Sequence, residues 1–363
     1  MNPSVDQFYM AHAIHLAQKG LYTTDPNPHV GCVLVKDGKI IAEGWTQRAG
    51  LAHAEVHALA QTDQAQGATA YVSLEPCSHT GRTGPCCDAL INAGVTRVVV
   101  AMQDPNPLVA GQGLEKIKAA GIEVRTGVLA DEAALLNPGF FKRMQQGLPF
   151  IRSKLACSLD GRTAMASGES KWITSESARQ DVQRWRAQSS AIMTGVDTVI
   201  ADDPLLNARV AFDLEQPVRV ILDTHLRLPL SAKLLQQTGE TWLFTSSNDQ
   251  LKLQALRDKG CKIIQLPAVN GRLDLLQVFK QLAHLQINSV WVEAGATLNG
   301  ALLETGLVDE WLIYMAPCVL GDQARGLFHL PALQALVDKK QLRWLDVRTV
   351  GTDLRLSFKL LTN

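Results

Sequence analysis

Residues 68–100 read ATAYVSLEPCSHTGRTGPCCDALINAGVTRVVV, and this stretch decides the fold of the first half of the chain. The apolar run at 68–74 predicts a strand, residues 86–93 predict a short helix, and the valine-rich run at 95–102 predicts a second strand. A strand, a helix and another strand in this order form the βαβ unit of a parallel sheet. Three of the chain's seven cysteines fall inside this unit.

The same alternation continues on both sides of this unit. Apolar patterns predict further helices and strands at 5–19, 30–35, 39–44, 53–61, 111–120 and 122–126. A last helix, at 131–147, is expected to end at Gly147, before Leu148-Pro149. Residues 1–147 therefore predict one α/β domain with helices on both faces of its sheet.

The second half of the chain, residues 148–363, predicts a second α/β domain. Strand-like apolar runs separated by helical segments lie at 150–156, 189–194, 218–223, 240–245, 262–265, 289–293 and 310–316. A chain of 363 residues is long enough for two domains that each bury a core of their own.

Composition argues against several classes of function. The chain carries 35 basic and 35 acidic residues, so the basic face of a nucleic-acid-binding protein is not expected. The first residues lack the charged and apolar segments of an export signal, and no apolar run approaches the ~20 residues that span a bilayer. We therefore expect a cytoplasmic protein whose seven cysteines stay reduced and form no disulfide framework.

The motifs around two of these cysteines indicate a zinc site. His53-Ala-Glu55 is followed by a Pro-Cys77 pair and then by a Pro-Cys86 pair, the order typical of zinc nucleobase deaminases. One imidazole and two thiolates leave the fourth zinc position to water, and zinc lowers the pKa of that water towards ~7. Glu55 is not a ligand in this pattern. We predict that it moves the water's proton to the ring nitrogen and to the leaving amine.

Other interpretations of these residues stay open. A lone buried histidine or cysteine is far more often a core residue than a ligand, and paired cysteines also bind structural zinc. Structural sites usually close all four positions with protein ligands, commonly in short Cys-x-x-Cys loops, whereas this sequence offers three well-placed ligands. Between the adjacent Cys86 and Cys87 we assign the ligand to Cys86, at the expected helix start, although spacing alone barely separates them.

Four segments carry a resemblance to a known family. PNPHVGC (26–32), HAEVHA (53–58), LEPCSHTGRTGPCC (74–87) and DPNP (104–107) resemble the bifunctional riboflavin-biosynthesis enzymes. These join a diaminohydroxyphosphoribosylaminopyrimidine deaminase to a 5-amino-6-(5-phosphoribosylamino)uracil reductase. Eight residues separate the two cysteine ligands, where most cytidine and tRNA-adenosine deaminases keep two, and the long loop is typical of this family.

The resemblance implies a cytidine-deaminase-like three-layer fold for the first domain and assigns its substrate contacts. Asn27 resembles the amide that reads the pyrimidine edge, and Asn106 resembles a further substrate contact. His79 and Arg82, in the long loop, would contact the ribose phosphate. The two Asn-Pro pairs are also ordinary turn formers. Thr46 stands where relatives often carry a histidine, so a substrate contact from that position is in doubt.

The second half shows no Gly-x-Gly-x-x-Gly fingerprint after a strand, so the common dinucleotide fold is not supported. A strand at 289–293 instead leads into a glycine turn and a helix, whose free amides would bind phosphate oxygens, although many such turns bind nothing. The runs SLDGRTA (158–164), SKWIT (170–174), GVDTVIADDPLL (195–206) and EAGATL (293–298) resemble the reductase half of the same family. The resemblance implies a dihydrofolate-reductase-like α/β fold with NADPH as hydride donor.

The resemblance also assigns the reductase site residue by residue. NADPH would contact Ala156, Trp172, Thr198, Asp202, Gly295, Ala296, Thr297, Leu298, Asn299, Gly300 and Ala301. The substrate would contact Ser170, Arg186, Leu205, Leu206, Arg209 and Glu293. The two arginines suit a phosphate, because a guanidinium pairs bidentately with its oxygens, but both are also explained as exposed surface charges. Glu293 is placed to hold sugar hydroxyls, and Lys154 to assist proton delivery.

The sequence thus predicts two consecutive steps on one small molecule. Zinc-dependent deamination of 2,5-diamino-6-(5-phosphoribosylamino)pyrimidin-4(3H)-one would be followed by NADPH reduction of the ribosyl chain, giving 5-amino-6-(5-phosphoribitylamino)uracil. A nucleoside or tRNA deaminase is the first rival, and the neutral charge and the long loop argue against it. A regulatory module with an inactive site is the second, and the retained His53, Glu55, Cys77 and Cys86 argue against that. Pairing of exposed sheets favours a homo-oligomer.

Overall fold

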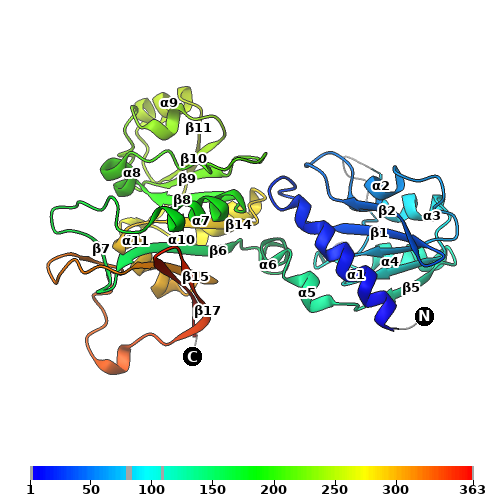
Figure 1. The fold of residues 1–363 in the computed structure, drawn as a ribbon. Helices are drawn as coiled ribbons and strands as arrows, with labels where there is room; N and C mark the ends of the chain where they lie inside the picture. The colour runs from blue at the N-terminus through cyan, green and yellow to red at the C-terminus, as the bar shows by residue number, and fades with distance from the viewer. Residues whose placement is uncertain (1–2, 79–83, 108–109, 362–363) are drawn as a thin grey trace. The chain divides into compact units, whose positions relative to one another are not determined.

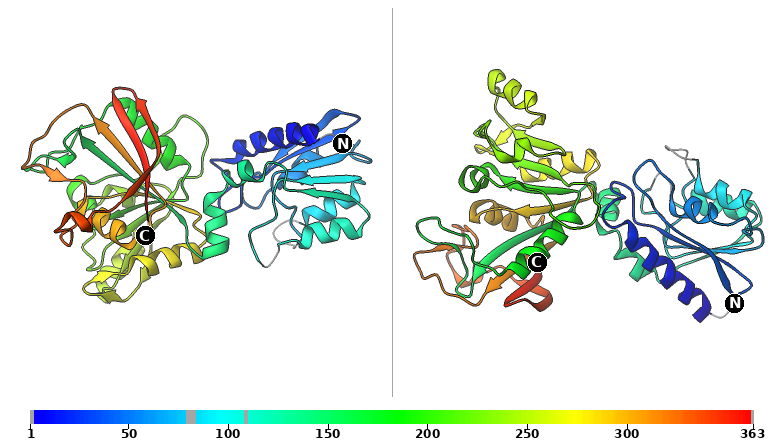
Figure 2. Two further views of the ribbon diagram at one scale, coloured as in Figure 1. Left: turned by 90° about the horizontal axis from the view of Figure 1, so that it is seen from below. Right: turned by 45° about the horizontal axis from the view of Figure 1, so that its top comes forward.

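The structure, a computed structural model, describes residues 3–78, 84–107 and 110–361. The chain divides into two units, Met1–Leu148 and Pro149–Asn363, and each has its own sheet and helices (Figures 1 and 2). The expected α/β class is confirmed for both. Within the described ranges, every helix is too short or too polar to cross a membrane.

The first unit is built on a five-stranded sheet in the order β2-β1-β3-β4-β5. β1 (Gly31–Lys36) runs antiparallel to β2 (Lys39–Trp45) and to β3 (Thr69–Val72), while β4 (Arg97–Val100) and β5 (Glu123–Thr126) run parallel to β3. The start of β1 and the carboxyl ends of β2, β3 and β4 therefore lie at the same end of the strands. This end of the sheet is called its carboxyl edge.

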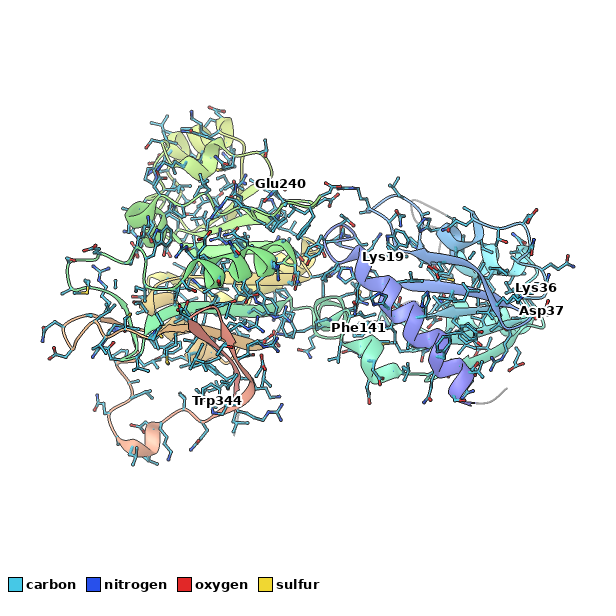
Figure 3. All side chains as sticks on the ribbon, in the orientation of Figure 1. Lys19, Lys36, Asp37, Phe141, Glu240 and Trp344 are labelled. Carbon is cyan, nitrogen blue, oxygen red and sulfur yellow. The ribbon has the colours of Figure 1, made fainter. Side chains whose placement is uncertain are left out.

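A tight turn joins β1 to β2 at the opposite end of these strands. Asp37 and Gly38 both have positive φ, 51° and 71°, as the type I′ turn requires, and its twist matches that of the flanking strands. Figure 3 labels Lys36 and Asp37 at this turn. The turn pairs Lys36 with Lys39, and a shift of register between Leu34 and Val35 then places Gly31 opposite Trp45 at the far end of the hairpin.

Helices cover both faces of this sheet because successive strand residues point to opposite sides. On one face the strands pack against α2 (Ala54–Leu59), α3 (Cys86–Asn92) and α4 (Gln112–Ala119). On the other they pack against α1 (Pro3–Ala17) and α5 (Ala130–Ala134). The expected three-layer arrangement is confirmed.

The single helix expected at 131–147 was wrong, because this segment forms two helices. α5 ends at Ala134, and α6 (Pro138–Gln146) begins after a break. Pro138 fits only the first turn of a helix, because it has no N–H to donate to a preceding turn. Asn137, just before it, uses its side chain elsewhere: Oδ1 accepts from the His29 amide at 2.7 Å, and Nδ2 donates to the His29 carbonyl at 2.9 Å.

The second unit contains a nine-stranded sheet in the order β11-β10-β9-β8-β14-β6-β15-β18-β17. The first seven strands of this order are mutually parallel, β18 runs antiparallel to β15, and β17 runs antiparallel to β18. The strands are β6 (Phe150–Ser158), β8 (Ala191–Gly195), β9 (Val218–Leu222), β10 (Thr241–Thr245), β11 (Cys261–Gln265), β14 (Ser289–Glu293), β15 (Glu310–Ala316), β17 (Leu342–Val350) and β18 (Asp353–Leu360). The C-terminal β17–β18 hairpin was not among the predicted strands.

Helices and small two-stranded ribbons complete this unit. α7 (Glu176–Ala187), α8 (Val196–Asp202) and α9 (Gln250–Asp258) share one buried apolar cluster with the parallel strands. The remaining elements are α10 (Leu275–His284), α11 (Ala296–Thr305), the ribbon of β7 (Arg162–Ala164) with β16 (Arg325–Gly326), and the ribbon of β12 (Ala268–Val269) with β13 (Arg272–Leu273). The carboxyl ends of the parallel strands share one edge, where open α/β sheets bind ligands.

Candidate functional site

The topology of the first unit gathers four predicted site residues at one sheet edge. Asn27 precedes β1, His53 follows β2, Cys77 follows β3 and Asn106 follows β4. Since β1 is antiparallel to β2 and β3, its start lies beside the carboxyl ends of the other strands. Residues far apart in the sequence therefore leave the sheet at the same edge.

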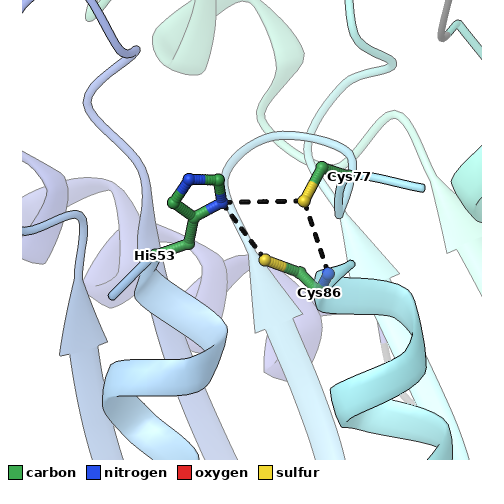
Figure 4. Close-up of side chains that lie close together, drawn as sticks. All are labelled: His53, Cys77 and Cys86. Carbon is green, nitrogen blue, oxygen red and sulfur yellow. Dashed lines mark hydrogen bonds between the residues drawn. The ribbon is translucent and has the colours of Figure 1, made fainter. Parts of the chain in front are cut away.

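Three predicted zinc ligands converge at this edge (Figure 4). His53 Nδ1 lies 3.3 Å from Cys86 Sγ and 3.6 Å from Cys77 Sγ. One ligand atom from each of the three residues lies within 4.8 Å of the others, and in the described part of the chain this group alone has such a geometry. A nitrogen and two sulfurs at this spacing fit a zinc ion whose fourth position stays open.

The backbone decides between the two adjacent cysteines. α3 begins at Cys86 after Pro85, and the Cys86 amide donates to Cys77 Sγ at 3.3 Å. The Cys87 amide donates to the Cys77 carbonyl at 3.2 Å, but the Cys87 side chain is buried in the apolar cluster that includes Leu90. Successive helix residues point about 100° apart, so only Cys86 faces the other two ligands.

Glu55 lies in the first turn of α2, two residues after His53, and is only 3% exposed. Burial raises the pKa of its carboxyl to about 7, and the nearby Cys77 sulfur acts in the same direction. A hydrogen bond from Cys86 lowers the pKa of the Cys77 thiol, and the hydrogen bond with Cys77 raises that of His53. The surroundings of Cys77 therefore favour its thiolate form, and the neighbouring Glu55 carboxyl can carry a proton near neutral pH.

Close packing of a helix on the sheet positions this carboxyl. A Cβ at Gly44 of β2 would lie 2.1 Å from the Ala54 carbonyl oxygen and 2.5 Å from the Ala58 amide nitrogen. Only glycine allows α2 to approach the strand this closely. The approach fixes the start of α2, and with it the directions of His53 and Glu55.

The structure places two of the four predicted substrate contacts of this unit, and their roles stay predictions. Asn27 is half-buried in the loop before β1, and its backbone amide donates to the Thr24 carbonyl at 2.9 Å. The backbone amide of Asn106 donates to Asp104 Oδ1 at 2.8 Å. His79 and Arg82 lie outside the described residues. Thr46 is buried, and its hydroxyl accepts from the Val30 backbone amide at 3.3 Å, which joins the segment before β1 to the segment after β2.

A cavity of about 1320 Å³ occupies the carboxyl edge of the parallel strands in the second unit. It brings together most residues that the sequence assigned to the reductase site: Lys154, Ala156, Ser170, Trp172, Arg186, Thr198, Asp202, Leu205, Leu206, Arg209, Glu293, Gly295, Ala296, Thr297, Leu298 and Ala301. Asn299 and Gly300 do not line it. Asn299 is fully buried and bonds Ser153 and the Ala294 carbonyl, and Gly300 packs directly on the His329 backbone.

A buried ion pair lies in the wall of this cavity. Arg186 donates from Nε to Glu293 Oε1 at 2.6 Å, from Nη2 to Oε2 at 2.7 Å, and from Nη1 to the Asn207 carbonyl at 2.9 Å. Trp291 Nε1 also donates to Glu293 Oε1 at 2.7 Å. Burial alone would raise the pKa of Glu293, but Arg186 outweighs it and lowers that pKa to about 2. Glu293 is therefore a fixed carboxylate at neutral pH.

Lys154 lies beside this pair, because β6 and β14 are parallel neighbours in which Lys154 and Glu293 stand opposite each other. Burial lowers the pKa of the Lys154 ammonium, and the charge of Arg186 acts in the same direction, while Glu293 opposes both. A lysine with a lowered pKa gives up its proton more readily than an exposed one. The arrangement suits a proton donor within the cavity.

Gln183 and Tyr314 are among the cavity residues that the sequence analysis missed. Gln183 Oε1 accepts from the Arg209 amide at 2.9 Å and so holds the segment that carries this arginine. Its position on α7, three residues before Arg186, is a signal that could have found it. Tyr314 donates to Asp181 Oδ2 at 2.6 Å, and no local pattern in the sequence marks that pairing.

Comparisons with known proteins agree with this geometry. Residues 3–102 match the cytidine and deoxycytidylate deaminase zinc-binding region, and residues 149–356 match the RibD C-terminal domain. The riboflavin biosynthesis protein RibD of Escherichia coli K12 is 53% identical, over 97% of this chain and 98% of its own length. The chain belongs to the RibD family of riboflavin-biosynthesis proteins. The RibD of Haemophilus influenzae is 50% identical, over 98% of this chain and 97% of its own length.

Solved structures of RibD proteins share the fold. Acinetobacter baumannii RibD in its second crystal form gives a TM-score of 0.93 at 49% identity, covering 99% of this chain and 100% of that one. A deaminase–reductase from Thermotoga maritima gives 0.86 at 31% identity, covering 99% and 100%. As a RibD protein, this chain is a deaminase and a pyrimidine reductase that uses zinc and NADPH.

The assignment of Cys86 rather than Cys87 as a ligand is directly testable. We expect Cys86→Ser to lose most bound zinc, because a neutral hydroxyl replaces a thiolate ligand. Cys87→Ala should keep about one zinc per chain, because it removes only a packed side chain. Zinc content is measured by elemental analysis of purified variants, and NADPH-dependent reduction serves as a control for folding of the second unit. Zinc loss from Cys87→Ala with retention in Cys86→Ser would reverse the assignment.

Proposed function

We propose that the first unit removes the 2-amino group of 2,5-diamino-6-(5-phosphoribosylamino)pyrimidin-4(3H)-one. His53, Cys77 and Cys86 hold the zinc ion, and Glu55 carries the proton. The observation that supports this best is the convergence of three ligand atoms within 4.8 Å beside a buried carboxyl. We place the boundary of this deaminase domain at residues 147 and 148, with the reductase domain following.

The donor set fits a catalytic zinc rather than a structural one. Bound zinc supplies an acidified water at neutral pH. Glu55, with its pKa raised to about 7, accepts a proton readily and returns it readily. It would protonate the ring nitrogen first and the departing amine second, so that ammonia leaves and a carbonyl remains. The buried setting keeps bulk water from competing for that proton.

Other residues at this edge would bind the substrate. Asn27 offers both an amide donor and a carbonyl acceptor to the pyrimidine edge, and Asn106 adds a further polar contact. His79 and Arg82 would pair with the ribose phosphate from the loop between the two cysteine ligands. The Asn137 side chain bonds both the backbone amide and the carbonyl of His29, and so holds the segment that follows Asn27.

Replacing the proton carrier should separate chemistry from metal binding. We expect Glu55→Gln to lower the rate of ammonia release at least ~100-fold, because the amide cannot accept the proton. Zinc content and NADPH-dependent reduction of the deaminated pyrimidine should stay near wild type. Ammonia release and NADPH absorbance are followed in separate assays. Deamination by Glu55→Gln at close to the wild-type rate would reject Glu55 as the proton carrier.

We propose that the second unit then reduces the ribosyl chain of the deaminated product. The 1320 Å³ cavity is large enough for a dinucleotide and a sugar phosphate side by side, and it is lined by nine of the eleven residues assigned to NADPH. Bound NADPH supplies the hydride for C1 of the open-chain sugar. Glu293 would hold the sugar hydroxyls through its fixed carboxylate, and Lys154 would deliver the proton. Arg186 orients Glu293.

Arg209 is the better phosphate ligand of the two arginines. Its side chain is exposed in the cavity wall, whereas the Arg186 guanidinium is held by both oxygens of Glu293 and by the Asn207 carbonyl. The guanidinium of Arg209 donates to Asn207 Oδ1 at 3.0 Å, which leaves further N–H groups for a phosphate.

Removing this arginine should weaken substrate binding alone. We expect Arg209→Ala to raise the KM of reduction about 10- to 100-fold, since a hydrogen bond to a charged group contributes about 1.5–3 kcal/mol. The Kd for NADPH, from quenching of tryptophan fluorescence, should not change. Arg257→Ala, an exposed arginine of α9 outside the cavity, is the matched control. An unchanged KM in Arg209→Ala would remove Arg209 from the phosphate site.

We also propose that the enzyme works in the cytoplasm as a homo-oligomer. All seven cysteines are free, as a reducing compartment requires. β17 is an edge strand of the nine-stranded sheet, and it carries exposed Trp344, Leu345 and Val347 (Trp344 is labelled in Figure 3). A long apolar edge strand left in water invites pairing with another chain. A second copy pairing through β17 would cover it.

The oligomer can be tested by light scattering coupled to size exclusion. We expect wild-type protein at micromolar concentration to elute with at least twice the 39.5 kDa chain mass, and Trp344→Asp to shift towards the monomer. Leu251→Asp, which charges an exposed apolar residue of α9, should keep the wild-type mass. A wild-type monomer would contradict the proposal.

A further inference from the structure

Glu75 is the most unusual acidic residue of the first unit. It follows β3 two positions before Cys77, and it is only 5% exposed. In the described part of the chain its carboxylate receives four backbone amides and no cation. Oε2 accepts from Asp104 at 3.1 Å and from Gly111 at 2.9 Å, and Oε1 accepts from Gly113 at 3.0 Å and from Leu114 at 3.3 Å. Converging backbone amides can stabilise a buried carboxylate without a counter-ion.

These hydrogen bonds join the two ends of one connection. Asp104 lies soon after β4, and Gly111 immediately precedes α4, so a single oxygen of Glu75 bridges positions seven residues apart. Asn106 lies between them. Its backbone amide donates to the Asp104 side chain, and its backbone carbonyl accepts from the Ala110 amide at 2.9 Å. The position of Asn106 therefore depends on a connection that Glu75 closes at its base.

The fit around Glu75 leaves little freedom. A Cβ at Gly113 would lie 2.0 Å from the Pro76 carbonyl oxygen, so the start of α4 packs directly on the segment that leads to Cys77. Gly111 has a φ of +82°, which glycine adopts without strain. The Glu75 amide also donates to the Met102 carbonyl at 3.0 Å, which extends the pairing of β3 with β4 towards the site.

We propose that Glu75 is a positioning residue for substrate binding in the deaminase: it holds Asn106 at the sheet edge where the zinc ligands converge. The proposal rests on the assignment of Asn106 as a substrate contact. Glu75 touches neither the substrate nor the metal in this role. It acts by fixing both ends of the segment on which Asn106 stands.

The test uses the full-length, zinc-loaded enzyme. Glu75→Gln keeps the size of the side chain, but its NH₂ group faces amide donors, so one pair of hydrogen bonds is lost. We expect the KM for the pyrimidine phosphate to rise about tenfold, the factor that corresponds to ~1.4 kcal/mol, with kcat changed less than ~3-fold. Zinc content and reductase activity should remain at wild-type values. Glu123→Gln, a carboxylate that is 66% exposed on β5, should match wild type throughout.

A double variant shows whether Glu75 acts through Asn106. Asn106→Ala alone should raise the same KM, and Glu75→Gln combined with Asn106→Ala should be no worse than Asn106→Ala, because both changes remove one interaction. Should Glu75→Gln fail to fold, Gly111→Ala displaces one end of the segment while leaving the carboxylate in place. Its added Cβ would lie 2.7 Å from Gln103 Nε2. The same rise in KM is expected from it.

The outcomes separate this inference from the proposed function. A loss of zinc or a fall in kcat at constant KM in Glu75→Gln would mean that Glu75 supports Cys77 instead, and would overturn the inference. A raised KM in Asn106→Ala with a normal KM in Glu75→Gln would overturn the inference and leave the proposed function intact. A normal KM in Asn106→Ala would overturn both the substrate role of Asn106 and the inference. Absence of ammonia release from the wild-type enzyme would reject the deaminase proposal itself.

Discussion

One edge of a five-stranded sheet controls the chemistry of the first unit. The β2–α2 and β3–α3 connections at this edge bring a nitrogen and two sulfurs within 4.8 Å, and the backbone amides of Cys86 and Cys87 donate to Cys77. The same edge carries Asn27 and Asn106, so the proposed metal ligands and the proposed substrate contacts lie in one region although they are far apart in the sequence.

The electrostatics of the second unit depend on a buried ion pair. In the wall of its cavity, the buried Arg186–Glu293 pair supplies a fixed carboxylate whose charge is already compensated. Removing one partner of such a pair would leave an uncompensated buried charge, which is strongly destabilising. Arg186 thus holds both oxygens of its partner in place, whereas the proposed phosphate ligand, Arg209, is exposed in the same cavity wall.

The sequence predicted features whose chemistry is local and missed those whose partners are distant. His53, Glu55, Cys77 and Cys86 were found because zinc chemistry restricts residue types at short spacings. Arg186 and Glu293 pair across 107 positions, and the four amides that donate to Glu75 belong to the backbone of other residues. Neither arrangement leaves a pattern in the sequence. Two misses did leave signals: Pro138 marked the break between α5 and α6, and the alternating Leu354–Leu360 run marked β18.

The place of β6 in its sheet has a consequence for how the chain is made. β6 is the first strand of the second unit to leave the ribosome, yet its neighbours β14 and β15 begin only at Ser289 and Glu310. The first unit closes on its own residues and can fold during synthesis, whereas β6 waits with an apolar face and both hydrogen-bonding edges unpaired. During synthesis the second half of the chain therefore exposes unpaired strand edges for longer than the first half does.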